Sequence, residues 1–434
     1  MAASRLYAPD YKPQPYWWEA APLKSLAEAP LPAEAEMVIV GSGYSGLAAA
    51  LVTARAGRST LVLEAEAAGQ GCSTRNGGQV STSLKPGYGD LAAKHGPERA
   101  FAIRKEGFNA LAFVERLIKD EGIDADWETV GRFHGAHNPK QYAKLESGLQ
   151  DQKAGIEIPF RLVPRAEQSS EIGSAAYYGG VVYPHHAALQ PAKFHAGLLD
   201  RVLQSGAAVL DRTPVTGVQR DGAAFRVNTP RGQVRARDVL IATNGYTGGT
   251  TPWLRRRVIP IGSYIIATEP LDPALAKELV PHKRVLSDTR KLVFYYRLSP
   301  DGRRMVFGGR VAASETDVGV SAPRLHDELC RLFPQLRGSR IAHSWMGTVA
   351  YTFDTMPHLG RAPDGLWYCM GYCGSGVSLA PYFGTRVGQQ ILGLAEGATA
   401  LDGLAFPTRP LYGGKPWFLP MAVRWYRLRD RVPV

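Results

Sequence analysis

The stretch Gly41-Ser42-Gly43-Tyr44-Ser45-Gly46 decides the fold, because its glycines have the spacing of a dinucleotide-binding turn. An apolar run at residues 37–40 precedes the turn, and an alanine-rich run at residues 47–51 follows it. This order predicts a buried strand, a tight turn and a helix. Glu64 ends the next apolar run, about 20 residues further on, where such a unit needs an acidic residue. Because these features agree, a glycine-rich turn in a fold without a nucleotide is disfavoured.

The residues of this turn have separate expected roles in holding a nucleotide. Gly41 permits the tight turn, Gly43 lets backbone amides approach a pyrophosphate, and Gly46 allows the helix to lie close to the strand. The start of the helix then faces the phosphate charge. Glu64 can accept hydrogen bonds from both ribose hydroxyls, and its charge disfavours NADP with its 2′-phosphate. The candidate nucleotide contacts in these two segments also include Tyr44, Ser45 and Ala65.

A polar, glycine-bearing segment at residues 73–79 favours FAD over NAD. It follows the ribose-binding strand closely, and a flavin needs backbone and polar groups along its ribityl chain and ring. On composition alone, an ordinary surface loop remains an alternative. The candidate FAD contacts in this segment are Ser73, Thr74, Arg75, Asn76, Gly77, Gly78 and Gln79.

The composition is that of a globular enzyme with a basic surface. The chain has 434 residues, of which 45% are hydrophobic and 21% charged, so a large core divided over two or three domains is expected. The net charge is +12, but the basic residues are scattered, and the densest run is residues 255–257. We therefore expect no nucleic-acid partner. Without an apolar leader after Met1, or a run of about 18 apolar residues, the cytoplasm is the expected location.

Metal and disulfide chemistry are not expected. The four cysteines lack zinc-type spacing and are expected to be free thiols: Cys72, Cys330, Cys369 and Cys373. His185 and His186 are adjacent, but no second ligand cluster accompanies them, so a helix entry is preferred to a metal site.

Other segments extend the α/β pattern. Residues 97–121 have helical periodicity, and residues 239–245 form an apolar run that ends in a polar turn. Two strands, 293–297 and 305–309, flank the turn Ser299-Pro300-Asp301-Gly302 and predict a hairpin. A strand at 366–370 leads into a glycine-rich loop, and a helix is expected around residues 384–394.

Together these stretches resemble the D-amino-acid oxidase superfamily, the glycine and sarcosine oxidase type, and within it most resemble gamma-glutamylputrescine oxidases. The similarity runs from the N-terminal arm to the C-terminus. Besides the turn at residues 41–46, it is carried by residues 75–79 (RNGGQ), 266–270 (IATEP), 295–298 (YYRL), 307–309 (FGG), 333–336 (FPQL), 345–347 (WMG) and 425–430 (WYRLRD).

The resemblance implies an α/β fold in which a Rossmann-type FAD-binding domain is interleaved with a substrate domain built on a mixed β-sheet. The expected FAD-binding domain takes residues 36–90, 160–250 and 340–400. The substrate domain takes residues 91–159 and 251–339. Residues 1–35 form an arm, in which the Tyr16-Trp17-Trp18 stretch packs on the body, and residues 401–434 form a tail.

The resemblance also implies further cofactor contacts. Val215, Asn244 and Gly245 fall where the family's cofactor-facing strand ends pass. The family loop near the flavin pyrimidine commonly reads Gly-His-Gly-Val and here reads Gly374-Ser375-Gly376-Val377, so no positive side chain is available at Ser375. Sarcosine oxidases attach FAD through a cysteine in the region that here reads Ser344-Trp345-Met346-Gly347, so FAD is expected to be non-covalent.

Candidate substrate contacts come from the expected substrate domain. Tyr264, Tyr295, Tyr296 and Trp345 could form an aromatic cage around an amine, although core packing explains each of them equally well. Arg310 could bind a substrate carboxylate or be a surface arginine. Glu269 could hold a distal ammonium or belong to a turn.

The resemblance implies oxidation of an amine to an imine, hydrolysis to an aldehyde, and reoxidation of the flavin by oxygen to give hydrogen peroxide. Residues 305–309 offer no lysine of the kind that sarcosine oxidases use for oxygen activation. A D-amino-acid or sarcosine-type dehydrogenase that feeds a quinone or carrier is therefore the alternative, and a flavin-binding protein without turnover is a third. The tail at residues 417–431 could lie on an anionic membrane, but docking on the body is preferred. The oligomeric state stays open.

Overall fold

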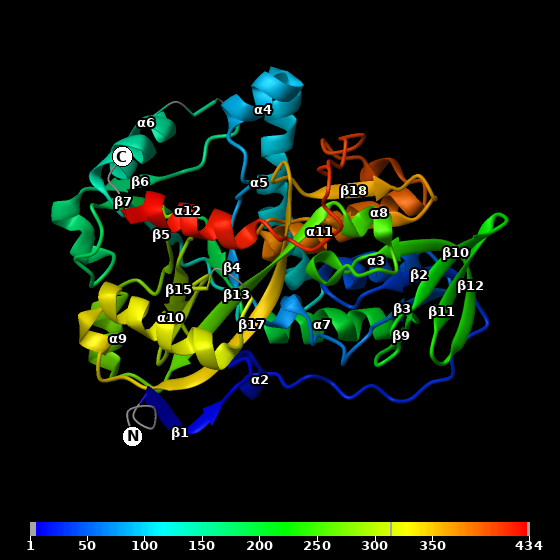
Figure 1. Cartoon of the computed structure of the whole chain (residues 1–434), viewed down its shortest axis with the longest axis horizontal. Coiled ribbons are helices and arrows are strands. Elements are labelled where there is room, and N and C mark those ends of the chain that lie inside the picture. The colour runs from blue at the N-terminus through cyan, green and yellow to red at the C-terminus, as the bar shows by residue number, and fades with distance from the viewer. Residues whose placement is uncertain (1–5, 151, 154, 313–314, 432–434) are drawn as a thin grey trace.

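The computed structural model describes residues 6–150, 152–153, 155–312 and 315–431. Two large β-sheets lie side by side along the long axis of the molecule, with helices packed around them (Figure 1), and a third sheet has only two strands. The expected α/β architecture is confirmed.

The cofactor-side sheet has a parallel centre, as the sequence predicts. β2 (Glu34–Val40) lies between β3 (Thr60–Leu63) and β12 (Gly232–Ile241), and both pairings are parallel. Every residue of β3 is buried, which explains its continuous apolar run. The rest of this sheet comprises β9 (Ala208–Leu210), β10 (Gly217–Asp221), β11 (Ala224–Thr229), β18 (His358–Arg361) and β19 (Trp367–Met370).

Two helices of this half approach each other at glycines. α3 (Tyr44–Arg55) begins directly after the phosphate turn, and α11 (Gly376–Ile391) crosses it. A Cβ on Gly384 would lie 2.4 Å from the carbonyl oxygen of Ser45, and one on Gly388 would lie 3.2 Å from Ala49. These glycines therefore let the two helix backbones lie in contact. α5 (Pro97–Asp120) and α7 (Pro191–Gln204) complete the apolar core around them.

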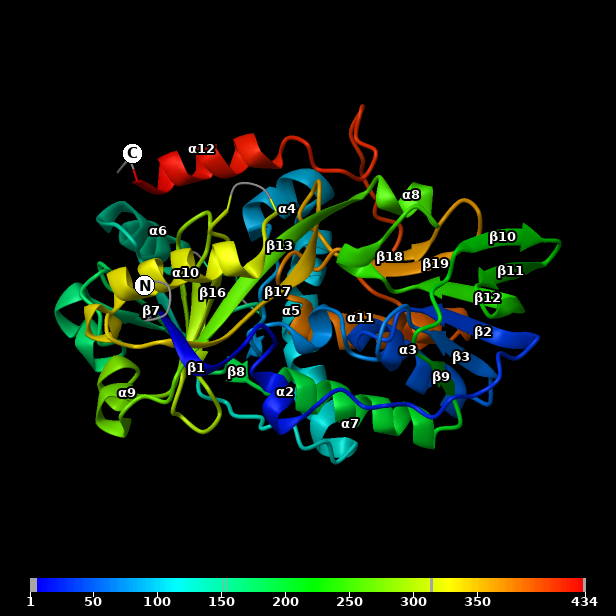
Figure 2. The same ribbon diagram turned by 60° about the horizontal axis from the view of Figure 1, so that its bottom comes forward.

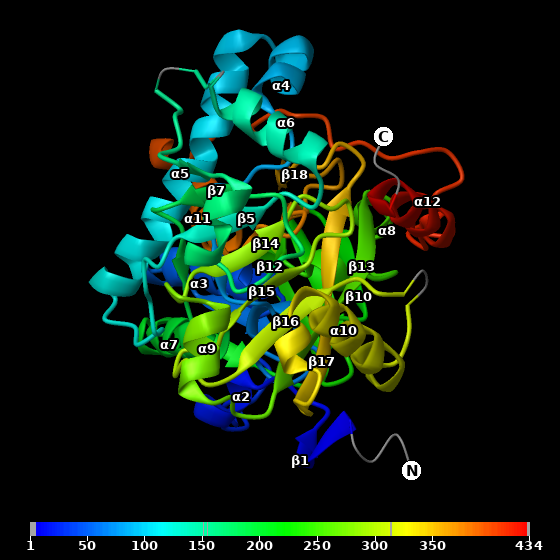
Figure 3. The same cartoon turned by 90° about the vertical axis from the view of Figure 1, so that its left-hand side faces the viewer.

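The second sheet has nine strands and is mixed. Its longest pair joins β13 (Val258–Thr268) to β17 (Ile341–Thr352) in antiparallel register. The predicted hairpin is confirmed, since β15 (Tyr295–Leu298) and β16 (Met305–Gly309) pair across the turn at residues 299–302. The remaining strands are β1 (Tyr7–Lys12), β5 (Arg132–Gly135), β6 (Arg161–Val163), β7 (Gly180–Tyr183) and β14 (Val285–Asp288). Figure 3 looks onto this half, with α9 (Pro273–Leu279) and α10 (Val318–Leu332) toward the viewer.

Strand membership shifts the proposed domain boundaries. β6, β7 and β17 belong to the nine-stranded sheet, although the sequence-based division places residues 160–183 and 341–352 with the FAD-binding domain. α5 packs in the core of the cofactor-side sheet, although its residues were expected in the substrate domain. We therefore propose that the chain crosses between the two halves more often than the sequence indicates.

The described parts of the N-terminal and C-terminal segments pack on the body. β1 pairs in parallel with β17, and Trp17 of α2 (Trp17–Ala20) is fully buried. α12 (Leu419–Arg431) lies along the outside of the nine-stranded sheet (Figure 2). The other helices are α4 (Tyr88–His95), α6 (Pro139–Gln150) and α8 (Pro252–Arg255).

Candidate cofactor site

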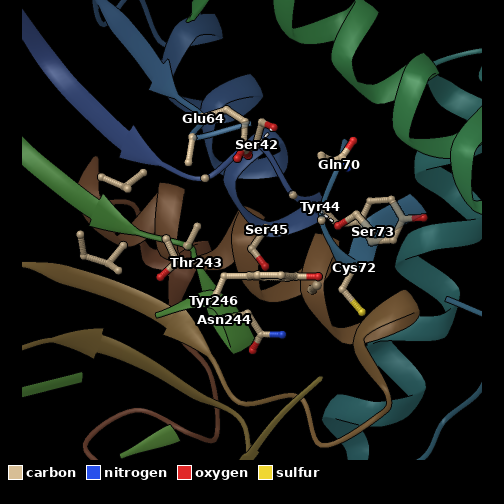
Figure 4. A pocket seen from close by; sticks show the side chains of 18 of the residues that line it. Ser42, Tyr44, Ser45, Glu64, Gln70, Cys72, Ser73, Thr243, Asn244 and Tyr246 are labelled. Atoms are coloured by element: carbon tan, nitrogen blue, oxygen red, sulfur yellow. Dashed lines mark hydrogen bonds between the residues drawn. The ribbon is translucent and has the colours of Figure 1, made fainter. Parts of the chain in front are cut away.

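A cavity of about 430 Å³ lies at the carboxyl ends of the parallel strands β2, β3 and β12. This is the edge at which open α/β sheets bind nucleotides. Many residues proposed from the sequence line the cavity: Gly41, Gly43, Tyr44, Ser45, Glu64, Ala65, Ser73, Asn76, Val215, Asn244, Gly374, Gly376 and Val377. In the view of Figure 4, Glu64 and Ser42 lie toward one end of this cavity, and Asn244 and Cys72 lie toward the other.

The phosphate turn cannot accept side chains at two of its glycines. Gly41 has a φ of 105°, and a Cβ there would lie 3.1 Å from the carbonyl oxygen of Ala242. Gly46 does not line the cavity, but a Cβ there would lie 2.0 Å from the carbonyl oxygen of Gly41. The turn is therefore folded tightly against the start of α3, whose N-terminus faces the cavity.

Glu64 and His195 fix the turn from two sides. The Glu64 carboxylate accepts hydrogen bonds from the backbone N–H and the Oγ–H of Ser42, each at 2.8 Å. The Nε2–H of buried His195 donates to the carbonyl oxygen of Ser42 at 2.8 Å. Burial lowers the pKa of His195, although the hydrogen bond to Ser42 raises it, so at neutral pH the ring is neutral and carries its proton on Nε2. The sequence motif missed His195, because it lies far along the chain.

The segment at residues 73–79 divides into cavity residues and structural residues. Ser73 and Asn76 line the cavity, and the Oγ of Ser73 accepts from the N–H of Tyr44 at 3.0 Å. The Thr74 Oγ1–H donates to the carbonyl of Gly69 at 2.6 Å, and the Arg75 Nε–H donates to that of Gln70 at 2.6 Å.

The last three residues of this segment hold neighbouring elements. A Cβ on Gly77 would lie 3.1 Å from the ring of Tyr295, and one on Gly78 would lie 2.1 Å from the carbonyl oxygen of Leu189. The Gln79 side-chain amide donates at 3.1 Å to the carbonyls of Leu286 and Tyr296. Thr74, Arg75, Gly77, Gly78 and Gln79 are thus placed to shape the cavity from behind and do not line it.

The loop before α11 brings a helix N-terminus to the cavity. Ser375 is the N-cap residue of α11, while Gly374, Gly376 and Val377 line the cavity around it. Asn244, with a φ of 44°, accepts the N–H of Gly371 on its Oδ1 at 2.9 Å and so joins the end of β12 to this loop. Gly245 packs against β17, since a Cβ there would lie 2.5 Å from the carbonyl oxygen of Thr348. This chain has Ser375 where the family loop commonly has a histidine, and the N-terminus of α11 supplies a partial positive charge at this position.

Several lining residues were not predicted. Tyr246 is half exposed, and its hydroxyl accepts the N–H of Thr348 at 3.2 Å. Tyr372 contacts both Ser45 and Cys369 through its hydroxyl. The strand-end position of residues 243–246 was the available signal for Tyr246. The other unpredicted lining residues include Ser42, Glu66, Gly69, Gln70, Gly71, Cys72, Pro214, Thr243, Thr250, Thr251, Val349 and Ala380.

The four proposed catalytic residues do not line this cavity. Tyr296 is buried, and its hydroxyl shares a hydrogen bond of 2.7 Å with that of Tyr177. Trp345 is also buried, and its Nε1–H donates to the carbonyl of Arg75 at 2.9 Å. Core packing, which the sequence left open, is therefore the role that their positions favour.

Tyr264 and Arg310 hold a neighbouring loop. The Tyr264 hydroxyl donates to the Glu315 carboxylate at 3.1 Å, and it accepts the N–H of Thr316 at 2.9 Å. The Arg310 Nη1 donates at 2.9 Å to both Glu315 and the carbonyl of Gly262. The Arg310 guanidinium is thus engaged by an ion pair within the chain, which does not favour a substrate carboxylate there. Glu269 accepts the N–H of Arg340 at 2.9 Å, as the turn interpretation expects.

A cationic group lies next to the loop that precedes α11. The Lys85 residue as a whole is exposed to solvent. Its pKa is nevertheless lowered, mainly because surrounding atoms desolvate the ammonium group. The positive charges of Arg132 and Lys291 lower the pKa further, and Cys373 raises it. Cys373 directly precedes the lining residue Gly374. Tyr351 faces the same loop, since a Cβ on Gly374 would lie 3.8 Å from its hydroxyl.

Comparison with known proteins agrees with this geometry. Residues 36–390 match the family model described as DAO, FAD dependent oxidoreductase. The chain belongs to this family. As a member of the DAO family it is an FAD-dependent oxidoreductase that acts on amines or amino acids.

Named relatives come from both sequence and structure. The chain is 32% identical to "Gamma-glutamylputrescine oxidoreductase" of Escherichia coli (strain K12) over 403 residues, which cover 92% of this chain and 93% of the relative. It is 22% identical to "Glycine oxidase" of Bacillus subtilis (strain 168), covering 82% and 93%. Among solved structures, glycine oxidase from Geobacillus kaustophilus aligns with a TM-score of 0.71 and 20% identity, covering 87% of this chain and 99% of that one.

The cavity fits the family's cofactor. The turn at residues 41–46 is packed tightly by its glycines and borders the cavity, the N-terminus of α3 faces it, and a carboxylate follows at the end of β3. Within the described residues, no group of three or more His, Cys, Asp or Glu side chains could hold a metal ion. Among the described helices, none is long and apolar enough to cross a membrane.

Proposed function

We propose that this DAO-family enzyme oxidises gamma-glutamylputrescine or a related N-substituted amine and passes the electrons to oxygen. The observation that carries the proposal is the 32% identity to the Escherichia coli gamma-glutamylputrescine oxidoreductase over nearly the full length of both chains. The glycine oxidase relatives cover less of this chain at lower identity.

The reaction needs orientation and exclusion of water more than a strong base. The amine carbon loses a hydride and the nitrogen loses a proton, which gives an imine. Water then adds to the imine carbon and the C–N bond breaks, which releases an aldehyde together with ammonia from a primary amine or a smaller amine from an N-substituted one. Bound FAD supplies the two-electron acceptor. Oxygen finally takes two electrons and two protons to give hydrogen peroxide.

In this proposal, different lining residues bind different parts of the cofactor. Glu64 is positioned for the ribose hydroxyls, and the turn at residues 41–46 for the pyrophosphate. Ser73, Asn76 and the N-terminus of α11 are positioned for the flavin end. The helix end would stabilise negative charge that arrives with the electrons.

Non-covalent attachment of FAD is part of the proposal. Residues 344–347 contain no cysteine, and Cys72 is the cysteine that lines the cavity. Burial raises the pKa of Cys72 to about 11, so it is a neutral thiol and a poor nucleophile at neutral pH.

We propose Lys85 as a candidate group for a substrate carboxylate on the basis of charge, since it does not line the cavity itself. Arg310 is engaged by Glu315, whereas Lys85 is exposed beside the loop before α11. Arg132 and Lys291 add positive charge there. A glutamyl carboxylate could therefore be held while the amine lies against the cofactor.

An anaerobic titration with gamma-glutamylputrescine tests the proposal. Loss of the oxidised flavin absorption band, followed by its return on admission of air, is the expected result. A protein that contains FAD but stays oxidised would refute the substrate and leave the family assignment intact.

A dehydrogenase that feeds a quinone or carrier is the second candidate. It is favoured by the absence of lysine from β16 (Met305–Gly309). Turnover with an artificial dye, compared with turnover in oxygen, separates the two. A reduced enzyme that reacts with the dye but only slowly with oxygen would establish the dehydrogenase.

A further inference from the structure

Large apolar side chains are concentrated on the outer surface of the C-terminal segment. Leu411 and Trp417, with exposed fractions of 92% and 64%, lie in the loop before α12. Met421, Trp425 and Leu428 on α12 are 71%, 57% and 54% exposed. A soluble surface rarely gathers so many large apolar groups without a use for them.

The three helical residues form one stripe. Met421, Trp425 and Leu428 are spaced four and three residues apart, so they lie on one side of α12. Leu419 and Val423 are buried against the body on the opposite side. The stripe is therefore the outward face of an amphipathic helix.

Specific contacts hold α12 with this face outward. The Asp430 carboxylate accepts the backbone N–H of Lys291 at 2.9 Å and that of Leu292 at 3.2 Å. Arg427 donates to the carbonyl of Val311. Because these contacts use the inner face, the apolar stripe cannot turn inward without breaking them.

Exposed arginines flank the stripe on both sides. Arg424 directly precedes Trp425 and lies along one side of the stripe, and Arg429 directly follows Leu428 and lies along the other side. A second copy of the chain on this face would bring like charges together, which disfavours self-association. An anionic surface with an apolar layer beneath it matches both features.

We propose that the outward face of α12 docks on the surface of an anionic lipid bilayer. Trp417, Met421, Trp425 and Leu428 enter the boundary between headgroups and acyl chains, and Arg424 and Arg429 contact anionic headgroups. This placement does not depend on the amine that the enzyme oxidises. It would bring the enzyme to the membrane without a spanning helix.

Vesicle co-sedimentation of the FAD-loaded full chain tests the proposal. We expect binding to phosphatidylcholine vesicles that contain phosphatidylglycerol, and little binding to phosphatidylcholine alone. Combined Met421→Ser and Trp425→Ser should weaken binding about 100-fold, since each large apolar side chain contributes about tenfold. Combined Arg424→Glu and Arg429→Glu should abolish the preference for anionic vesicles, and salt at about 0.5 M should weaken binding of the unmodified chain.

Matched controls separate the face from general effects. Leu203→Ser removes an exposed apolar side chain on α7, and combined Arg324→Glu and Arg337→Glu makes the same charge change at exposed positions outside α12. Both should bind as the unmodified chain does, and the thermal midpoints of all variants should agree. Equal binding to neutral and anionic vesicles, or unchanged binding by both α12 variants, would overturn the proposal. A dimer in sedimentation velocity that the α12 variants abolish would overturn it in favour of self-association.

Discussion

At the scale of single residues, close backbone packing at glycines and the charges of side chains shape the cofactor cavity and its surroundings. The turn at residues 41–46 illustrates the first, since its fold leaves 2.0 Å between a Cβ on Gly46 and the carbonyl oxygen of Gly41. The sequence predicted the glycine spacing and the position of Glu64, because both follow from local chain geometry. It could not predict that Tyr264 and Arg310 meet at Glu315, because that contact joins segments about 50 residues apart whose pairing depends on sheet register.

Replacing Gly46 should disrupt the cofactor turn. Gly46→Ala is expected to lower stability by about 3 kcal/mol or more and to lose most FAD binding. The new Cβ would meet a backbone oxygen, which cannot move aside as a flexible side chain could. Gly148→Ala in the exposed part of α6 is the control, since a Cβ there meets nothing within 4 Å. Thermal unfolding and the flavin content of purified protein are the measurements. Normal flavin content in Gly46→Ala would contradict the assigned turn.

Replacing Lys85 should affect substrates that carry a carboxylate. Lys85→Met is expected to raise KM for gamma-glutamylputrescine about tenfold or more and to change kcat less, because a charged hydrogen bond to the substrate is lost. Steady-state kinetics with putrescine, which lacks the carboxylate, and with Lys94→Met, an exposed lysine on α4, are the controls. An equal effect on both amines would remove Lys85 from carboxylate recognition.

At the scale of elements, we propose that α11 supplies the positive electrostatic potential at the flavin end of the cavity. Its N-terminus lies at the cavity, with Ser375 as N-cap. The sequence predicted this helix eight residues late, at Gly384, because Pro381 and the glycines at its start reduce the helical signal. Tertiary packing against α3 determines where it begins.

A negative charge at the start of α11 should oppose reduction of the flavin. Ser375→Asp is expected to lower the flavin midpoint potential by on the order of 30 mV, equivalent to about 1.4 kcal/mol for two electrons. Aspartate is a good N-cap residue, so stability should not fall with it. Spectroelectrochemical titration measures the potential, and the neutral Ser375→Asn is the control. The same potential in both variants would mean that this helix end does not act on the flavin.

At the scale of the whole molecule, the cavity lies at one edge of the cofactor-side sheet, and Val349 of the nine-stranded sheet also lines it. The mixed sheet and the interleaving were predicted through resemblance, and the number of crossings was not. β6 and β7 are too short to indicate which sheet they join, and β17, although long, mixes polar and apolar residues without a pattern that identifies its sheet. Only the pairing partners decide that, and those of β17, which are β1 and β13, lie far away in the chain.

The folded molecule should lose stability as the pH falls below about 6.5. Burial lowers the pKa of His134 to about 3 and also lowers the pKa of His186 and His195. Below a pH of about 6.5 these histidines are therefore protonated in the unfolded chain but stay neutral in the folded chain. Each such histidine costs about 1.4 kcal/mol per pH unit below 6.5. Burial raises the pKa of Asp288 to about 6, which works in the opposite sense below pH 6 and offsets one of the three. The thermal midpoint of the FAD-loaded enzyme at pH 7.5 and 5.5 should show a net fall.

A variant isolates one of these histidines. His134→Asn should make the dependence on pH shallower, whatever its own stability, whereas His282→Asn at an exposed position should leave the slope unchanged. A steeper slope in His134→Asn would contradict the assignment of a neutral His134.

The segment at residues 73–79 also touches the N-terminal arm. The indole N–H of Trp17 donates to the carbonyl of Asn76 at 2.8 Å, and that of Trp18 donates to Thr74 at 3.0 Å. The same backbone forms part of the cofactor cavity at Ser73 and Asn76. Binding of FAD and ordering of the arm are thermodynamically linked. If bound FAD stabilises the ordered arm by some free energy, then the ordered arm strengthens FAD binding by the same amount. We therefore expect Trp17 and Trp18 to support cofactor retention, and cleavage that removes them should weaken FAD binding although neither lines the cavity.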